Sequence, residues 1–168
     1  MKDLVIRQIK ESDAKKVLEA FLEITKTSKW LLTAREEGPK SVREELKYIR
    51  NHAKTKNSHL AMAMMRGEIV GLVGAEGANK RRNSHVAVVG LAIRKKWRGK
   101  GIGKEAMRYI ISWAKGAGLK KLRLGVIAEN KIAQKLYKSM GFKKEGRFSR
   151  ELKIGSKYYD TLELAKFI

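Results

Sequence analysis

One stretch of the chain, Arg94–Met107 (RKKWRGKGIGKEAM), joins a strand-like segment to a helix-like one. Apolar residues fill most of His85–Ile93, which predicts a strand, and from Ile102 onward they recur at helical spacing. Between the two segments, three glycines stand among six cationic side chains. Glycine costs backbone entropy and clustered cations repel one another, so this connection needs a compensating partner. An anion bound at the start of the helix would supply it.

The rest of the chain continues the alternation of strand and helix patterns. The predicted order, β-α-α-β-β-β-α-β-α-β-β, is that of an α/β fold with a mixed sheet. No low-complexity linker or internal repeat interrupts the pattern, so we expect a single domain over residues 1–168. The predicted strands are 4–9, 60–65, 69–75, 85–93, 122–126, 146–152 and 158–164, the last two joined by a two-residue turn. The predicted helices begin at a Ser12-Asp13 cap, at a Ser41 capping box, near Gly101 and at Asn130.

Composition excludes several kinds of site. The chain has no cysteine, which rules out disulfides and cysteine nucleophiles, and its three histidines lack the spacing of metal ligands, so we assign no metal. Apolar runs are too short for a membrane span and no signal-peptide pattern is present, so we expect a cytoplasmic protein with no membrane partner. Of the net charge of +22, residues 80–123 contribute 14 basic and 1 acidic groups. That field favours an anionic partner such as a phosphorylated cofactor, nucleic acid or a ribosome-like assembly.

Spacing separates three phosphate-binding interpretations of the glycines. A nucleotide P-loop needs a glycine five residues before Gly103 and a hydroxyl after Lys104, and neither is present. Residues 101–106 fit the dinucleotide pattern G-x-G-x-x-A, but the strand ends well before the first glycine and no acidic residue follows about twenty positions later. The third pattern, (Q/R)-x-x-G-x-(G/A), is the pyrophosphate loop of acyl-coenzyme A enzymes, and residues 98–103 (RGKGIG) match it at the start of a helix.

A second motif lies 27 residues further along the chain. Residues 130–142 (NKIAQKLYKSMGF) match N-x-x-A-x-x-(L/F)-Y-x-x-x-G-F, which places Asn130 and Tyr137 on one face of a short helix. With both motifs on the expected helices, the chain resembles the GNAT superfamily of N-acetyltransferases over nearly its whole length.

The resemblance implies a site with acetyl-CoA as cosubstrate. In this family the fourth and fifth strands splay apart, and the pantetheine arm of the cosubstrate pairs with backbone exposed in the gap. The resemblance therefore implies that Tyr137 is the general acid that protonates the departing thiolate. It also implies a set of cofactor-binding residues: Leu91 and Ile93 for the pantetheine arm, Arg98, Gly99, Gly101, Gly103 and Lys104 for the pyrophosphate, and Asn130 for the amide arm.

Motif matching assigns no general base. Several GNAT groups carry a carboxylate on the fourth strand, but residues 84–93 contain none. Ribosomal-protein N-terminal acetylators, which resemble this chain, have a glutamate twelve residues before the tyrosine, where this chain has Gly125. Glu36, Glu37 and Glu129 are candidates, and each is also explained as an ordinary solvated charge. Tyr158-Tyr159-Asp160 in the last hairpin is expected either to shape the acceptor site or to pack across the strands.

The missing base favours a weakly basic acceptor. A lysine-like amine, with a pKa of about 10.4, costs roughly 4.6 kcal/mol to deprotonate at pH 7, whereas a peptide α-amine near pKa 8 costs about 1.4 kcal/mol. We therefore predict transfer to a protein, peptide or amino-acid α-amine, including a ribosome-associated substrate, with a small-molecule amine as the alternative acceptor. The alternative function is a non-enzymatic nucleic-acid- or ribosome-binding module that uses Lys80, Arg81, Arg82 and the lysines around Trp97, although no known motif supports it.

Overall fold

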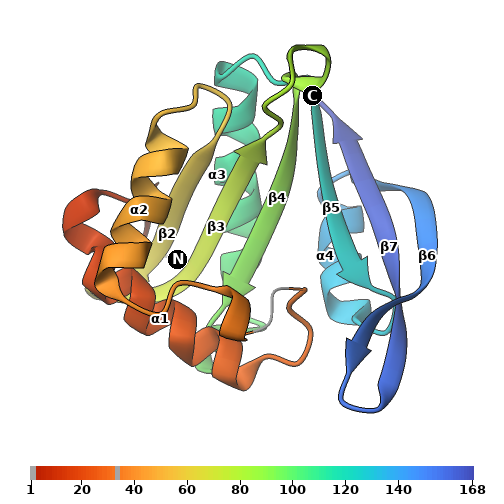
Figure 1. Ribbon diagram of the computed structural model, residues 1–168, viewed down its shortest axis with the longest axis horizontal. Coiled ribbons are helices and arrows are strands. Elements are labelled where there is room, and N and C mark those ends of the chain that lie inside the picture. The colour runs from red at the N-terminus through yellow and green to blue at the C-terminus, as the bar shows by residue number, and fades with distance from the viewer. Residues whose placement is uncertain (1–2, 33–34) are drawn as a thin grey trace.

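The computed structural model describes residues 3–32 and 35–168. They form a seven-stranded sheet with the strand order β1-β2-β3-β4-β5-β7-β6, covered by helices on both faces (Figure 1). All neighbouring strands are antiparallel except β4 and β5, which are parallel. The strands are β1 (Leu4–Gln8), β2 (His59–Met65), β3 (Glu68–Gly77), β4 (Val86–Ile93), β5 (Lys121–Ile127), β6 (Lys143–Ile154) and β7 (Lys157–Phe167). The helices are α1 (Ala14–Thr27), α2 (Val42–Ala53), α3 (Ile102–Gly116) and α4 (Lys131–Ser139).

The predicted order of elements and the α/β fold with a mixed sheet are confirmed. The bounds differ by a few residues, most clearly in β6 and β7. These strands continue past the apolar alternation because pairs such as Lys143 with Ala165 extend the ladder into charged residues. The predicted two-residue turn is also observed, since Ile154 pairs with Lys157 and Gly155 has a φ of 60°.

The start of the first helix differs from the prediction. Helix α1 begins at Ala14, and the Asp13 side chain does not cap it. The Asp13 carboxylate instead accepts hydrogen bonds from the Lys10 amide at 2.8 Å and from the Arg7 guanidinium at 2.7 and 2.8 Å. It therefore anchors the short 3-10 turn before α1 to strand β1. Ser41 caps α2 as predicted, because its hydroxyl accepts a hydrogen bond from the Glu44 amide at 3.2 Å.

The helices form two layers around the sheet. In Figure 1, α1 and α2 lie in front of the strands and α3 and α4 lie behind them. Successive side chains of a strand point to opposite faces of the sheet, so each helical layer packs on its own core. Leu122 lies in one buried cluster with Ile110 of α3, and Met62 lies in another with Val17 and Ile49. No helix among the described residues is long and apolar enough to cross a membrane.

Strands β4 and β5 separate halfway along their length. Their parallel pairing is limited to Val86 with Lys121, Ala87 with Leu122 and Val88 with Arg123. Beyond that point β4 still pairs with β3 as far as Ile93, and β5 still pairs with β7 as far as Ile127 (Figure 1). The facing edges of the two strands therefore have no ladder partner, at the carboxyl ends where α3 and α4 follow. The carboxyl ends of parallel strands are where α/β folds bind ligands.

Candidate active site

The loop before α3 exposes a run of backbone amides. Gly99 and Gly101 have φ values of 74° and 80°, a left-handed conformation that favours glycine. Among the described residues, no amide from Gly99 to Gly103 donates a hydrogen bond to a carbonyl, whereas the next amide, that of Lys104, donates to Gly101 at 3.0 Å. Free amides at a helix N-terminus form a site for phosphate. The local geometry therefore fits the predicted pyrophosphate loop.

Gly103 has a packing role as well. A Cβ at this position would lie 3.2 Å from Leu136 Cδ2 of α4 and 3.5 Å from Leu91 Cδ2 of β4. Glycine therefore lets the start of α3 approach both elements. This junction brings the two sequence motifs together on one side of the strand splay.

The structure divides the six cations around the glycines into two groups. Arg94 pairs with Glu23 at 3.2 Å and with Glu68 at 2.5 Å, and Lys96 pairs with Glu68 at 2.8 Å. Those two cations are part of the protein's own ion pairs. The other four are not in ion pairs within the described residues and remain available to an anion: Lys95, Arg98, Lys100 and Lys104.

Arg98 is tied to the end of β4. Its Nε donates a hydrogen bond to the Ile93 carbonyl at 3.0 Å, so the side chain connects the glycine loop to the strand edge predicted to contact the pantetheine arm. Next to that edge, Gly90 is exposed, and a Cβ there would meet no atom within 4 Å. On the far side of the splay, Asn130 caps α4, because its Oδ1 accepts a hydrogen bond from the Ala133 amide at 3.2 Å.

Tyr137 lies on α4 with its ring almost fully covered. The ring packs against Phe142 with the centroids 6.0 Å apart, and the residue is 8% exposed. Its hydroxyl makes no hydrogen bond among the described residues, and it is not one of the fully buried polar atoms that lack a partner, so it reaches the surface. Burial raises the pKa of Tyr137 to about 12. The phenol is therefore protonated at neutral pH, as a general acid must be.

None of the three carboxylates proposed as base candidates is enclosed in a site. Glu36 and Glu37 lie exposed in the 3-10 turn Arg35–Glu37 between α1 and α2, and Glu129 lies exposed in the turn before Asn130. Because all three residues are exposed, no observation distinguishes one of them as a base.

The structure places three residues that the sequence analysis did not single out, Trp30, Leu32 and Glu163, beside Tyr159 and Gly125. Trp30 of the α1–α2 connection meets Tyr159 of β7 edge to face at 6.1 Å. Leu32 of the same connection and Glu163 of β7 both reach Gly125 of β5, since a Cβ on Gly125 would lie 2.9 Å from Leu32 Cδ1 and 3.2 Å from Glu163 Oε1. The register of β5 with β7 pairs Gly125 with Glu163, whereas no sequence pattern links Trp30 or Leu32 to them.

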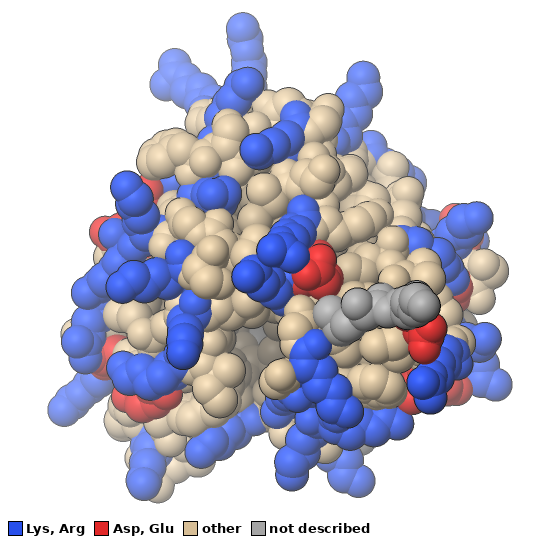
Figure 2. Space-filling view, turned by 180° about the vertical axis from the view of Figure 1, so that it is seen from behind, with Lys and Arg blue, Asp and Glu red and all other residues tan. Residues whose placement is uncertain are grey.

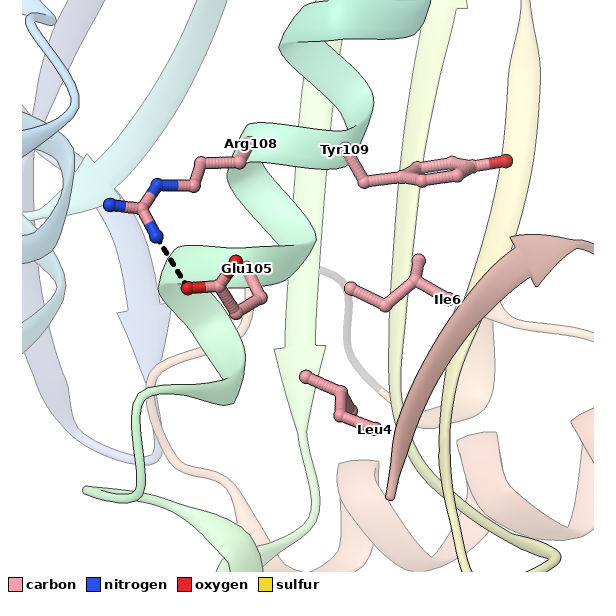
Figure 3. A pocket seen from close by; sticks show the side chains of 5 residues that line it. All are labelled: Leu4, Ile6, Glu105, Arg108 and Tyr109. Atoms are coloured by element: carbon pink, nitrogen blue, oxygen red, sulfur yellow. Dashed lines mark hydrogen bonds and ion pairs between the residues drawn. The ribbon is translucent and has the colours of Figure 1, made fainter. Parts of the chain in front are cut away.

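A hollow of about 520 Å³ lies elsewhere, at the outer edge of the sheet between β1 and α3 (Figure 3). Leu4 and Ile6 line it from the strand, and the Glu105–Arg108 ion pair lines it from the helix. None of the predicted cofactor or catalytic residues takes part, so this hollow is separate from the candidate site. Within the described residues, no cluster of His, Cys, Asp and Glu side chains is arranged to hold a metal.

Basic side chains are spread over the face that carries α3 and α4. Figure 2 shows them on all sides of this face with a few acidic residues between them, not gathered into one stripe. A nucleic-acid-binding surface is expected to concentrate its cations along a groove or helix. The distribution therefore gives the nucleic-acid-binding alternative no support.

Comparison with known proteins decides the family. The family model of the acetyltransferase (GNAT) family matches residues 22–142, which include the strand splay and both motifs. The chain belongs to this family. The predicted GNAT membership is thus confirmed, and acetyl-CoA, the predicted cosubstrate, is the acyl donor that this family uses. Membership in an acetyltransferase family does not favour the non-enzymatic alternative.

Individual relatives agree with the GNAT assignment. The chain is 28% identical over 109 residues to the L-amino acid N-acetyltransferase AaaT of Escherichia coli (strain K12), covering 62% of this chain and 65% of the relative. This GNAT chain spans less than two thirds of the length of the curated relatives it matches. Its fold is similar to a GNAT acetyltransferase from Streptococcus pneumoniae, with a TM-score of 0.94, 24% identity and coverage of 99% and 100% of the two chains. It is also similar to yncA from Salmonella typhimurium, solved with its cofactor acetyl-CoA, with a TM-score of 0.88, 13% identity and coverage of 98% and 94%.

Proposed function

We propose that this chain, acting as one domain in the cytoplasm, transfers the acetyl group of acetyl-CoA to the α-amine of an amino acid or peptide. The observation that carries the proposal is the run of free amides from Gly99 to Gly103, at the end of a strand that has separated from its parallel neighbour. The amides and the four unpaired cations suit a pyrophosphate. The unpaired strand edges suit an arm that carries its own amide groups.

The geometry supports direct transfer without a covalent enzyme intermediate. The chain has no cysteine to accept an acetyl group. The neutral amine attacks the thioester carbon, so that a C–N bond forms and the C–S bond breaks. An unpaired backbone amide on the β4 edge stabilises the oxyanion. Tyr137 gives its proton to the departing thiolate and recovers one from solvent.

An α-amine is the favoured acceptor for two reasons. With a pKa near 8, about a tenth of it is neutral at pH 7, whereas the neutral fraction of a lysine-like amine is several hundred-fold smaller at roughly 0.04%. The name of the Escherichia coli relative, an L-amino acid N-acetyltransferase, also supports an amino-acid α-amine. The N-terminal α-amine of a ribosome-associated protein is a second candidate acceptor of the same chemical type. The positive charge of residues 80–123 would favour it by attracting a ribosome-like assembly.

Thermal melting tests the cosubstrate. At 100 times its dissociation constant a ligand adds about 2.7 kcal/mol, which for a domain of this size raises the melting temperature by roughly 5–11 °C. We expect that shift with acetyl-CoA, and no shift with NADH or a short DNA duplex at about 0.15 M salt. Release of coenzyme A is then measured with a panel of amines. Absence of both the shift and the release would reject the proposed function.

A further inference from the structure

Glu163 stands between two glycines in the sheet. It pairs with Gly125 of β5 on one side and with Gly146 of β6 on the other. Because neither neighbour has a side chain, the Glu163 side chain can lie over β5. Its Oε1 lies 3.2 Å from the position that a Cβ on Gly125 would occupy. The carboxylate therefore covers Gly125.

This carboxylate faces the side of the sheet that α1 and α2 occupy. The adjacent pair, Leu124 with Leu164, points into the core on the α3 side, so Gly125 and Glu163 point the other way. Gly125 also lies past Arg123, the last β5 residue that pairs with β4. The carboxylate is thus placed beside the open edge of β5, with Leu32 of the α1–α2 connection reaching the same point.

Glu163 is also free of internal partners. Among the described residues it forms no hydrogen bond or ion pair, whereas Asp160 on the same strand is bound by Arg147 and by the Arg150 amide. The neighbouring strands place Arg123 and Lys143 on this face, both opposite Ala165, two residues along β7 from Glu163, and Leu32, which reaches the same point, is apolar. A half-buried carboxylate without a partner, in a chain with 39 basic residues, remains available to an ammonium group.

The position that Glu163 covers has no side chain of its own. Gly125 lies beyond the last residue of β5 that pairs with β4, and no residue of β4 supplies a carboxylate. A side chain at Gly125 would meet both Leu32 and Glu163 at 3.2 Å or less. Gly125 and Glu163 are therefore complementary. Strand β5 has no side chain at Gly125, and the carboxylate of Glu163 on β7 occupies that space.

We propose that Glu163 is the general base of the acetyl transfer, an inference that rests on the proposed function. Its carboxylate takes one proton from the α-ammonium group of the acceptor and leaves the nitrogen lone pair free. The nitrogen then bonds to the thioester carbon, the C–S bond breaks, and the thiolate takes the proton of Tyr137. The second proton that the nitrogen loses passes to solvent, Glu163 releases its proton to solvent as well, and Tyr137 is reprotonated from solvent.

The test compares Glu163→Gln with Glu151→Gln, a matched removal of an exposed carboxylate on β6. Both variants should melt close to wild type and keep the melting shift with acetyl-CoA. For an α-amine acceptor at pH 7, we expect kcat/KM to fall about 10²-fold in Glu163→Gln and to stay unchanged in Glu151→Gln. The deficit should shrink as pH approaches the pKa of the acceptor, because solvent then supplies the neutral amine. Glu163→Asp should recover part of the activity.

Two results would overturn the assignment. A wild-type rate and pH profile in Glu163→Gln would show that the carboxylate takes no part. A loss that is equal at every pH, with no recovery in Glu163→Asp, would show a structural role instead of proton transfer. Failure of the proposed function has a different signature, because the wild-type chain itself would then release no coenzyme A with any amine.

Discussion

The two sides of the candidate site are built in different ways. The cofactor side is a short run of consecutive residues, Gly99 to Gly103, whose backbone amides face outward because of local φ values and a helix start. The acceptor side gathers Leu32, Gly125 and Glu163 from three segments far apart in the sequence, and its chemistry comes from side chains. A cosubstrate shared by a family can be bound by local backbone geometry. A specific acceptor needs contacts that only the assembled sheet provides.

Tyr137→Phe should have the largest effect, because it removes the hydroxyl that we propose protonates the departing thiolate. We expect kcat to fall about 10²-fold while the acetyl-CoA melting shift is kept, since the ring and its packing on Phe142 remain. With a pKa of about 12 the wild-type phenol remains protonated, so no loss of kcat is expected up to about pH 10. Steady-state kinetics from pH 6 to pH 10 would check both points, and equal kcat in the variant would remove the acid role.

The Glu45→Gln variant tests whether Glu45, a second carboxylate on the α1–α2 side of the sheet, serves as the general base. Glu45 lies on the covered face of α2, is 4% exposed, and burial raises its pKa to about 7. The folded chain therefore holds this proton more tightly than the unfolded chain. The stability of the protein should fall as pH rises from about 4.5 to 7, by roughly 3 kcal/mol in total.

Chemical denaturation of Glu45→Gln at two pH values measures this effect. We expect the variant to be more stable than wild type at pH 8 and equal to it at pH 4, with kcat/KM unchanged. A pH-dependent loss of activity, instead of a gain in stability, would transfer the base role from Glu163 to Glu45.

Gly103→Val tests the packing at the cofactor side. Its side chain would push against Leu91 and Leu136, which already lie 3.5 and 3.2 Å from the position of a Cβ. We expect a loss of about 1–3 kcal/mol in unfolding free energy and a reduced acetyl-CoA melting shift. Gly116→Ala, at the other end of α3 where a Cβ meets no atom within 4 Å, is the matched control and should lose neither. An unchanged acetyl-CoA melting shift in Gly103→Val would show that Gly103 is not needed for cosubstrate binding.

Arg123→Gln should have the smallest effect and concerns the acceptor alone. Arg123 is exposed on the face that Glu163 occupies, two residues before Gly125. If it pairs with the carboxylate of an amino-acid acceptor, KM should rise a few-fold, in line with an exposed ion pair worth about 1 kcal/mol or less. Amino-acid amides, which lack the carboxylate, should show no change, and Lys115→Gln on α3 should change neither. An equal rise in KM for amino acids and for amino-acid amides would show that Arg123 does not pair with the acceptor carboxylate.

Sequence patterns predicted the features that depend on residues close together in the chain. The order of elements followed from apolar periodicity, whereas phosphate binding by the glycines before α3 stays a prediction. The prediction that Asp13 caps α1 was wrong because Arg7 and the Lys10 amide hold that carboxylate. The position of Glu163 over Gly125 depends on a strand register across 38 residues, which no local pattern specifies.

Acetylation of two isomeric acceptors would show whether the enzyme acts on α-amines. In Nε-acetyllysine the free amine is the α-amine, and in Nα-acetyllysine it is the ε-amine, so the pair differs only in which amine is available. Release of coenzyme A is measured for each acceptor at pH 7 with saturating acetyl-CoA. We expect clear release with Nε-acetyllysine and close to none with Nα-acetyllysine, because the ε-amine costs roughly 3 kcal/mol more to deprotonate. Preference for Nα-acetyllysine would contradict transfer to an α-amine.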